Sequence, residues 1–200
     1  MPIKIGSELF TKELNLIKDP TFKDIIIDIL DNHIHYDNFL NPSSSTGKHH
    51  PPRDRERYGN TNHTKAVVKL CNVLLSSRLD LNGYYSDVIY AAAILHDMWK
   101  YSGTKHSHRN HAELAYNYLC SYKAKNNISE DSYIGKKINL MNEIIKFHMG
   151  HWSLSDIDNW INEINEYCGD DRYERDSILL LHYADLIASR KFYDVEDFAL

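Results

Sequence analysis

Residues 88–95 form a continuous apolar stretch that is followed directly by His96 and Asp97. A helix that is apolar on nearly all sides is usually buried, so we expect the end of this stretch to lie inside the protein. A buried imidazole and a buried carboxylate need a hydrogen bond, an ion pair or a metal ion, because leaving them unsatisfied is costly. Adjacent His and Asp side chains can also bind one divalent cation together. The rest of the chain determines whether further ligands are available.

The composition is typical of a single folded domain. The chain has 200 residues, of which 42% are hydrophobic, and this is enough for a real core. Its longest apolar run is far shorter than the about 20 residues that span a bilayer, and the N-terminus lacks the apolar segment of a secretory signal. We expect a protein of the cytoplasm, or of the host cytoplasm if a phage encodes it, with no membrane association. Three separated cysteines are expected to stay reduced: Cys71, Cys120 and Cys168.

The net charge and the histidine content of the chain restrict the classes of function that we expect. The formal net charge of −5 argues against strong non-specific binding of nucleic acids. The 12 histidines direct attention to metal ligands, since neutral imidazole is a common one.

The hydrophobic pattern predicts helices almost throughout, and no segment shows the period-two alternation of a strand. We therefore expect an all-α fold, a compact helical bundle. The predicted helices cover residues 21–39, 61–79, 86–99, 109–124, 129–149 and 173–192, and a weaker one, capped by Ser155, covers residues 155–167.

Residues 41–60 form a long irregular segment between the first two predicted helices. Such a segment is too long for a simple connector in a compact domain, and the cluster Lys48, His49 and His50 favours a functional role. The arginines that follow at positions 53, 55 and 57 alternate with acidic residues at 54 and 56. This alternation favours an exposed loop whose charges neutralise one another.

Several ionisable side chains fall on helix faces or ends that are expected to point into the bundle. Each of them alone is more typical of a satisfied core residue than of a metal ligand. Their combined order along the chain, however, favours a set of metal ligands. They are His63, His96, Asp97, His111, His148 and Asp185. His108 lies three residues before His111, so the choice between these two stays open; His33, His35, His106 and His108 are interpreted as surface residues.

Two segments resemble the HD-domain superfamily of metal-dependent phosphohydrolases, whose pattern is a His, then His-Asp, then a late Asp. They are ILHDMWK at residues 94–100 and HYADLIASR at residues 182–190. The resemblance covers roughly residues 45–191 and implies an HD domain over residues 45–200, with residues 1–44 as an N-terminal helical segment packed on it.

A second pair of segments is similar to phage-type HD proteins and to an HD-type 3′–5′ exoribonuclease. These are STGKHHP at residues 45–51 and GNTNHT at residues 59–64, although the latter departs from the usual Gly-Gly-Leu-like turn. FHMGHW at residues 147–152 also resembles the phage-type proteins. The chain lacks the Gly-Tyr-Pro signature of the HD-GYP phosphodiesterases, so that activity is not expected.

The resemblance implies a ligand set and a chemistry. His63, His96, Asp97 and Asp185 would hold one cation, and in binuclear members Asp97 would bridge to a second ion held by His111 and His148. Mixed imidazole and carboxylate ligands suit Mn, Fe, Co, Ni or Zn. The metal would activate water for attack on phosphorus. Asp97 and Lys100 are the expected catalytic residues, and the expected substrate-binding residues are Lys48, His49, His50 and His151.

Three functions remain open at this point. The leading one is hydrolysis of a nucleotide-type phosphate ester by a phosphohydrolase or phosphodiesterase. An HD-fold mixed-valence diiron oxygenase would use the same ligand types, and a non-catalytic nucleotide-binding module would not need them all. The familiar HD 5′-nucleotidases and deoxynucleotide triphosphohydrolases are less expected, because residues 98–102 contain no acidic side chain.

Overall fold

The computed structural model describes residues 6–43, 50–101, 107–150 and 157–190. Within these ranges the chain forms α-helices and short 3₁₀ turns and no strand, which confirms the all-α fold class. None of the described helices is long and apolar enough to cross a membrane. In chain order the elements are α1 (Gly6–Leu9), α2 (Thr11–Leu14), α3 (Pro20–Asn32), α4 (Asp37–Leu40), η1 (Pro52–Arg55), α5 (Gly59–Ser76), η2 (Leu79–Leu81), α6 (Tyr84–Leu95), α7 (His111–Lys125), α8 (Tyr133–Phe147), α9 (Ile157–Cys168) and α10 (Arg172–Ala188).

The helix predicted over residues 21–39 is wrong as a single element, because the chain breaks between α3 and α4. Helix α3 begins as expected, with Asp19 accepting a hydrogen bond from the Phe22 amide. It ends near His33, where weak helix formers follow one another. The His35 side chain then accepts a hydrogen bond from the Asp37 amide, and this starts the short helix α4.

The other predicted helices are present, but their ends differ from the prediction by one to four residues. Helix α6 ends at Leu95 rather than at residue 99, because the chain turns there: Met98 N–H donates to Leu95 O and Lys100 N–H to Asp97 O. Two predicted boundary residues, 155 and 192, lie outside the described residues.

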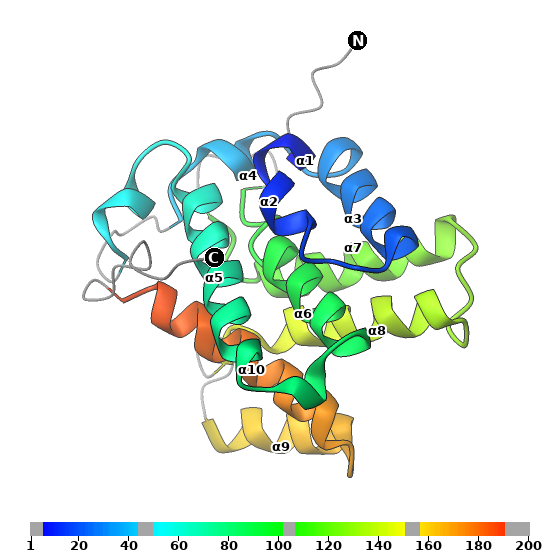
Figure 1. Ribbon diagram of the computed structural model, residues 1–200. Coiled ribbons are helices and arrows are strands. Elements are labelled where there is room, and N and C mark those ends of the chain that lie inside the picture. The colour runs from blue at the N-terminus through cyan, green and yellow to red at the C-terminus, as the bar shows by residue number, and fades with distance from the viewer. Residues whose placement is uncertain (1–5, 44–49, 102–106, 151–156, 191–200) are drawn as a thin grey trace.

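Helix α6 is the centre of the bundle. All of residues 88–95 are buried, with exposed fractions between 0% and 7%, as the apolar pattern predicts. Helices α5, α8 and α10 pack against α6, and α7 packs against α8 (Figure 1). The end of α6 therefore lies among these helices.

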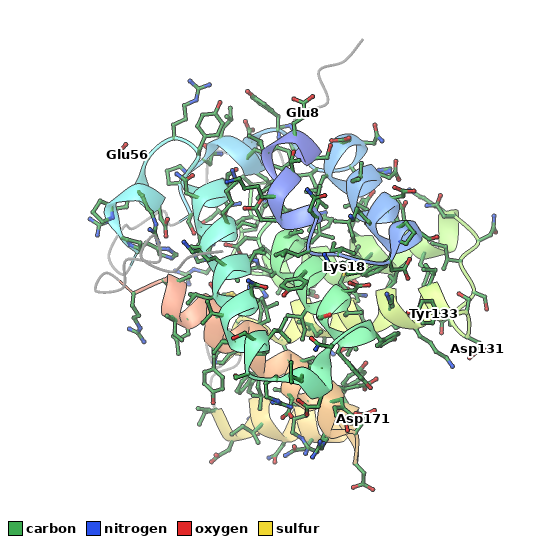
Figure 2. The ribbon with its side chains drawn as sticks, viewed as in Figure 1. Glu8, Lys18, Glu56, Asp131, Tyr133 and Asp171 are labelled. Atoms are coloured by element: carbon green, nitrogen blue, oxygen red, sulfur yellow. The ribbon has the colours of Figure 1, made fainter. Side chains whose placement is uncertain are left out.

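One buried carboxylate ties the connection between α2 and α3 to the bundle. Asp87 accepts hydrogen bonds from the backbone amides of Lys18 and Asp19, at 2.8 and 3.0 Å. The ammonium of Lys137, on α8, lies 3.0 Å from both Asp19 and Asp87. Figure 2 labels Lys18 in the connection between α2 and α3. The predicted domain boundary between residues 44 and 45 lies outside the described residues.

Candidate metal centre

Five helices bring the six predicted ligands to one place. Most of these side chains stand at a helix end: two directly follow α6, one begins α7, one directly follows α8, and one lies in the last turn of α10. The sixth lies near the start of α5. The side chains form two groups whose ligand atoms lie within 4.8 Å of one another: His63, His96 and Asp185, and Asp97, His111 and His148.

Asp97 faces both groups, with a different oxygen toward each. Its Oδ1 lies 2.9 Å from Nε2 of His111 and 3.9 Å from Nε2 of His148. Its Oδ2 lies 3.7 Å from Nε2 of His96 and 3.9 Å from Nε2 of His63. A single carboxylate thus stands between the two groups.

Each group is also compact within itself. Nε2 of His63 lies 2.9 Å from Oδ1 of Asp185 in the first group. In the second group, the Nε2 atoms of His111 and His148 lie 3.3 Å apart. Separations of this size leave room for one ion between the ligand atoms of each group.

Three of the four imidazoles are oriented by their own backbone. Nδ1 of each ring donates to the carbonyl three residues earlier: His96 to Ala93 at 2.8 Å, His111 to His108 at 2.9 Å, and His148 to Ile145 at 2.6 Å. The last carbonyls of a helix have no partner within the helix, so two of these acceptors are available because α6 and α8 end there. A hydrogen on Nδ1 leaves the lone pair of Nε2 directed into the site, as a metal ligand requires.

One buried atom, Nε2 of His96, indicates whether these residues fit a metal ion. His96 is completely buried, and its Nε2 has no hydrogen-bond partner. A buried polar atom without a partner is costly and rare. Its position beside Asp97 and the other members of the first group is explained if a cation binds there. These buried His and Asp groups can therefore hold a metal ion.

At His148 and Asp97 the electrostatics favour the protonation states that bind metals. Burial and the neighbouring His96 and His111 lower the pKa of His148 to about 3. Burial alone would raise the pKa of Asp97, but Lys100, His96 and His111 outweigh it and hold this pKa well below its usual value. Neutral imidazole and ionised carboxylate are the coordinating forms.

His63 differs from the other three rings. Burial alone would lower its pKa, but the carboxylates of Asp185 and Asp54 raise it to about 10. The same contact with His63 lowers the pKa of Asp185, against the effect of its burial. Two acidic side chains, one on each side of the ring, therefore act on His63.

A cavity of about 340 Å³ opens over five of the six side chains, all except His96. Among the described residues its lining includes cationic and polar side chains together with two apolar ones: Lys100, His108, Arg109, Arg190, Met149 and Leu186. Nζ of Lys100 donates to Oδ2 of Asp97 at 2.7 Å. The interpretation of His108 as a surface residue is wrong, because it is half-buried and lines this cavity.

The predicted substrate-binding residues are only partly covered by the structure. His50 lines the cavity, whereas Lys48, His49 and His151 lie outside the described residues, as does His106. His33 and His35 are exposed, as predicted.

The interpretation of residues 53–57 as an exposed, self-neutralised loop is wrong for Asp54. The Asp54 side chain is fully buried, and its Oδ2 lies 3.3 Å from Nδ1 of His50 and 3.5 Å from Nδ1 of His63. Glu56 is exposed and projects from the outer edge of this loop (Figure 2). The sequence gives no signal for the difference, because it depends on how the loop folds back on α5.

His182 is a second residue that the sequence analysis did not assign to the site. It lines the cavity, its Nδ1 donates to His148 O at 2.8 Å, and its ring packs on Trp160. Gly150, with a φ of 57°, makes room for this ring, because a Cβ there would overlap the imidazole.

Comparison with known proteins adds no relative. Scans against protein-family models, curated proteins and solved structures gave no match.

Proposed function

We propose that this protein is an HD-domain, metal-dependent phosphohydrolase or phosphodiesterase that cleaves a small nucleotide-type phosphate ester. The observation that carries the proposal is the position of Asp97 between two buried ligand groups at the floor of a cavity with cationic walls. The motifs around His96 and Asp185 agree with this reading, since they resemble that superfamily.

The proposed ligands divide as the two groups do. His63, His96 and Asp185 would hold one divalent transition metal, and His111 and His148 a second, with Asp97 contributing one oxygen to each. The ligand types favour Mn, Fe, Co, Ni or Zn. When bound, such an ion lowers the pKa of a coordinated water molecule, which makes a nucleophile available near neutral pH.

The cavity walls support an anionic substrate of limited size. Lys100, Arg109 and Arg190 line the cavity, and Lys and Arg side chains bind phosphate oxygens well. The volume of about 340 Å³ lies at the small end of the range of about 300–1,000 Å³ typical of small-molecule sites. Met149 and Leu186 offer an apolar surface for a flat organic group such as a base.

The test is a turnover assay with metal-free protein reconstituted with Mn²⁺. Mono-, tri-, cyclic and oligonucleotides are supplied, and released phosphate and nucleoside products are measured by chromatography. We expect turnover of at least one class, lost in Asp97→Ala and retained in Arg78→Ala, whose side chain pairs with Asp80 and Asp176 rather than with the site.

Two results would contradict the proposal. Bound metal with no turnover across the panel, but with saturable nucleotide binding, would indicate a binding module. Two irons per chain, with a paramagnetic Fe(II)/Fe(III) signal and oxygen consumption, would indicate an oxygenase.

A further inference from the structure

Asp54 is a buried carboxylate that the proposed ligand set does not use. It lies in the 3₁₀ turn η1, just before α5, and its side chain is completely buried. Its Oδ2 faces two imidazoles, those of His50 and His63. A fully buried carboxylate next to a proposed ligand calls for a reason.

The turn that carries Asp54 is firmly held. Asp54 O accepts from the Ser43 amide at 2.8 Å, and it packs so closely on Gly59 that a Cβ there would overlap it. Arg55 donates twice to His50 O, from Nε at 2.9 Å and from a terminal nitrogen at 2.7 Å. The position of the carboxylate is therefore fixed by contacts on both sides.

His63 lacks the local support that orients the other three rings. It lies inside α5, and its Nδ1 has no hydrogen-bond partner, although the residue is buried. Oδ1 of Asp54 is likewise buried without a hydrogen-bond partner, although Nε of Arg53 lies 3.6 Å from it. Nδ1 of His63 lies 3.5 Å from the other oxygen, Oδ2, which also faces His50, so this donor needs only a small adjustment to pair with the carboxylate.

We propose that Asp54 is a positioning residue that accepts the Nδ1 hydrogen of His63 and so directs Nε2 of that ring to the metal beside Asp185. A ligating His commonly donates its second nitrogen to a carboxylate, which fixes its tautomer and makes it a better ligand. His50, at the cavity wall, donates to the same oxygen, Oδ2, at 3.3 Å. The inference rests on the metal-binding part of the proposed function and does not depend on the reaction.

The alternative to this hydrogen bond is a further metal site formed by the same side chains. His50, Asp54 and His63 have ligand atoms within 4.8 Å of one another. That site would require His63 to bind metal through both nitrogens and to lose its last ring hydrogen. The hydrogen-bonded arrangement needs no such loss, and metal stoichiometry distinguishes the two.

The test compares Co²⁺ binding in the full chain and in Asp54→Asn. Affinity is measured by competition with a chelator, stoichiometry by elemental analysis, and ligand geometry from the visible Co²⁺ absorption bands. We expect about 10- to 100-fold weaker binding and shifted bands, with the number of ions unchanged. Asp54→Ser has a smaller side chain that cannot reach His63, and it should give the same result. It replaces the Asn variant if that variant does not fold.

Asp87→Asn is the matched control. Asp87 is also a buried carboxylate with several partners, but it binds Lys137 and backbone amides instead of a proposed ligand. This variant should lower the melting temperature and leave Co²⁺ affinity and bands unchanged.

Wild-type affinity and unchanged bands in both Asp54 variants would overturn the inference alone. Loss of one bound ion in these variants would also overturn it, in favour of the further metal site. Absence of Co²⁺ binding by the wild-type chain would overturn the proposed function as well, so the two failures are distinguishable.

Discussion

Lys100 shares one oxygen of Asp97 with the first ligand group. Its ammonium lies 2.7 Å from Oδ2, the oxygen that also faces His96 and His63. The lysine thus places a positive charge where a cation is proposed to bind. A bound ion and the lysine compete for this oxygen, and a substrate phosphate offers the displaced ammonium a new partner.

Lys100→Met should therefore separate metal binding from turnover. We expect cation affinity to rise by roughly tenfold, since nearby like charges repel and partial exposure of the lysine reduces the effect. We expect kcat/KM for the phosphate ester to fall about 10- to 100-fold, the effect of losing one hydrogen bond from a charged donor. Isothermal titration and steady-state assays check the two parts.

Lys146→Met is the control for that experiment, because Lys146 is an exposed lysine paired with Glu143. It should change neither quantity. Weaker cation binding by Lys100→Met would show that the lysine supports the ligand geometry instead of competing with it.

His148 makes the stability of the metal-free protein depend on pH. Its folded-state pKa, about 3, lies below the usual value of 6.5, so the unfolded chain takes up the proton first as the pH falls. Stability from this group is fully present above pH 6.5 and is lost below it, by at most about 1.4 kcal/mol per pH unit. Between pH 7 and 5, His148→Gln should lose about 2 kcal/mol less than the wild type.

Urea unfolding at the two pH values, with a chelator present, measures this difference. The lowered pKa values of Asp97 and Asp185 act only at lower pH, near and below 3.8, and do not interfere. An equal loss in both proteins would show that His148 is not held neutral in the folded state.

At the scale of elements, the buried ion pairs of Lys137 hold α8 to α6 and to the start of α3. The ammonium lies against Asp87 and Asp19, and over the ring of Phe22. Removing one member of a buried pair leaves the other charge without compensation. Lys137→Met should therefore destabilise the fold by about 3–5 kcal/mol.

A double-mutant cycle checks the reason for this loss. Lys137→Met combined with Asp87→Asn should cost less than the sum of the two single changes, because the residual buried charge is gone. Lys136→Met, at the exposed neighbouring position, should change the free energy of unfolding by no more than about 0.5 kcal/mol. Strict additivity would show that the ion pair contributes no coupling.

The long helices from α5 onward were predictable from the sequence and their ends were not, for a physical reason. The 3.6-residue pattern depends only on neighbours along the chain, whereas an end depends on which distant group satisfies the backbone. After α6, Tyr101 N–H donates to Asn38 Oδ1, and the Asn60 amide donates to Asp97 O. Both partners come from segments that the sequence alone does not place beside this turn.

The same reasoning explains which site residues could be predicted. His63, His148 and Asp185 share helix faces with apolar residues, so their inward direction follows from periodicity. Asp54 lies in a charged loop, and its burial depends on the backbone hydrogen bond to Ser43. No local sequence pattern predicts that the loop folds back in this way.

At the scale of the whole molecule, metal binding and folding are expected to be linked. The two ligand groups draw on five helices, so a bound ion stabilises the folded chain and has no such site in the unfolded one. At a free Co²⁺ concentration 100 times Kd, stability should rise by about 2.7 kcal/mol per ion. For a chain of this size, this corresponds to a melting temperature higher by roughly 5–10 °C.

Calorimetry with increasing Co²⁺, followed by addition of a chelator, measures the shift and its reversal. Asp97→Ala should lose most of the shift, whereas Lys146→Met should keep it. An unchanged melting temperature at saturating Co²⁺ would contradict binding at the buried groups.

The hydrogen bonds from Nδ1 of His96 and His148 to carbonyls one turn earlier fix the tautomer of each ring. The direction in which each ring points is set separately, by the helix that carries it. Each ring and its acceptor belong to the same short stretch of backbone. Inserting one residue early in α8 would rotate both together by about 100°, which keeps the tautomer of His148 while turning the ring away from Asp97. The length of the helix therefore sets the direction in which these ligands point. A change in that length leaves the tautomer of each ring, and so its ability to bind a metal ion, unchanged.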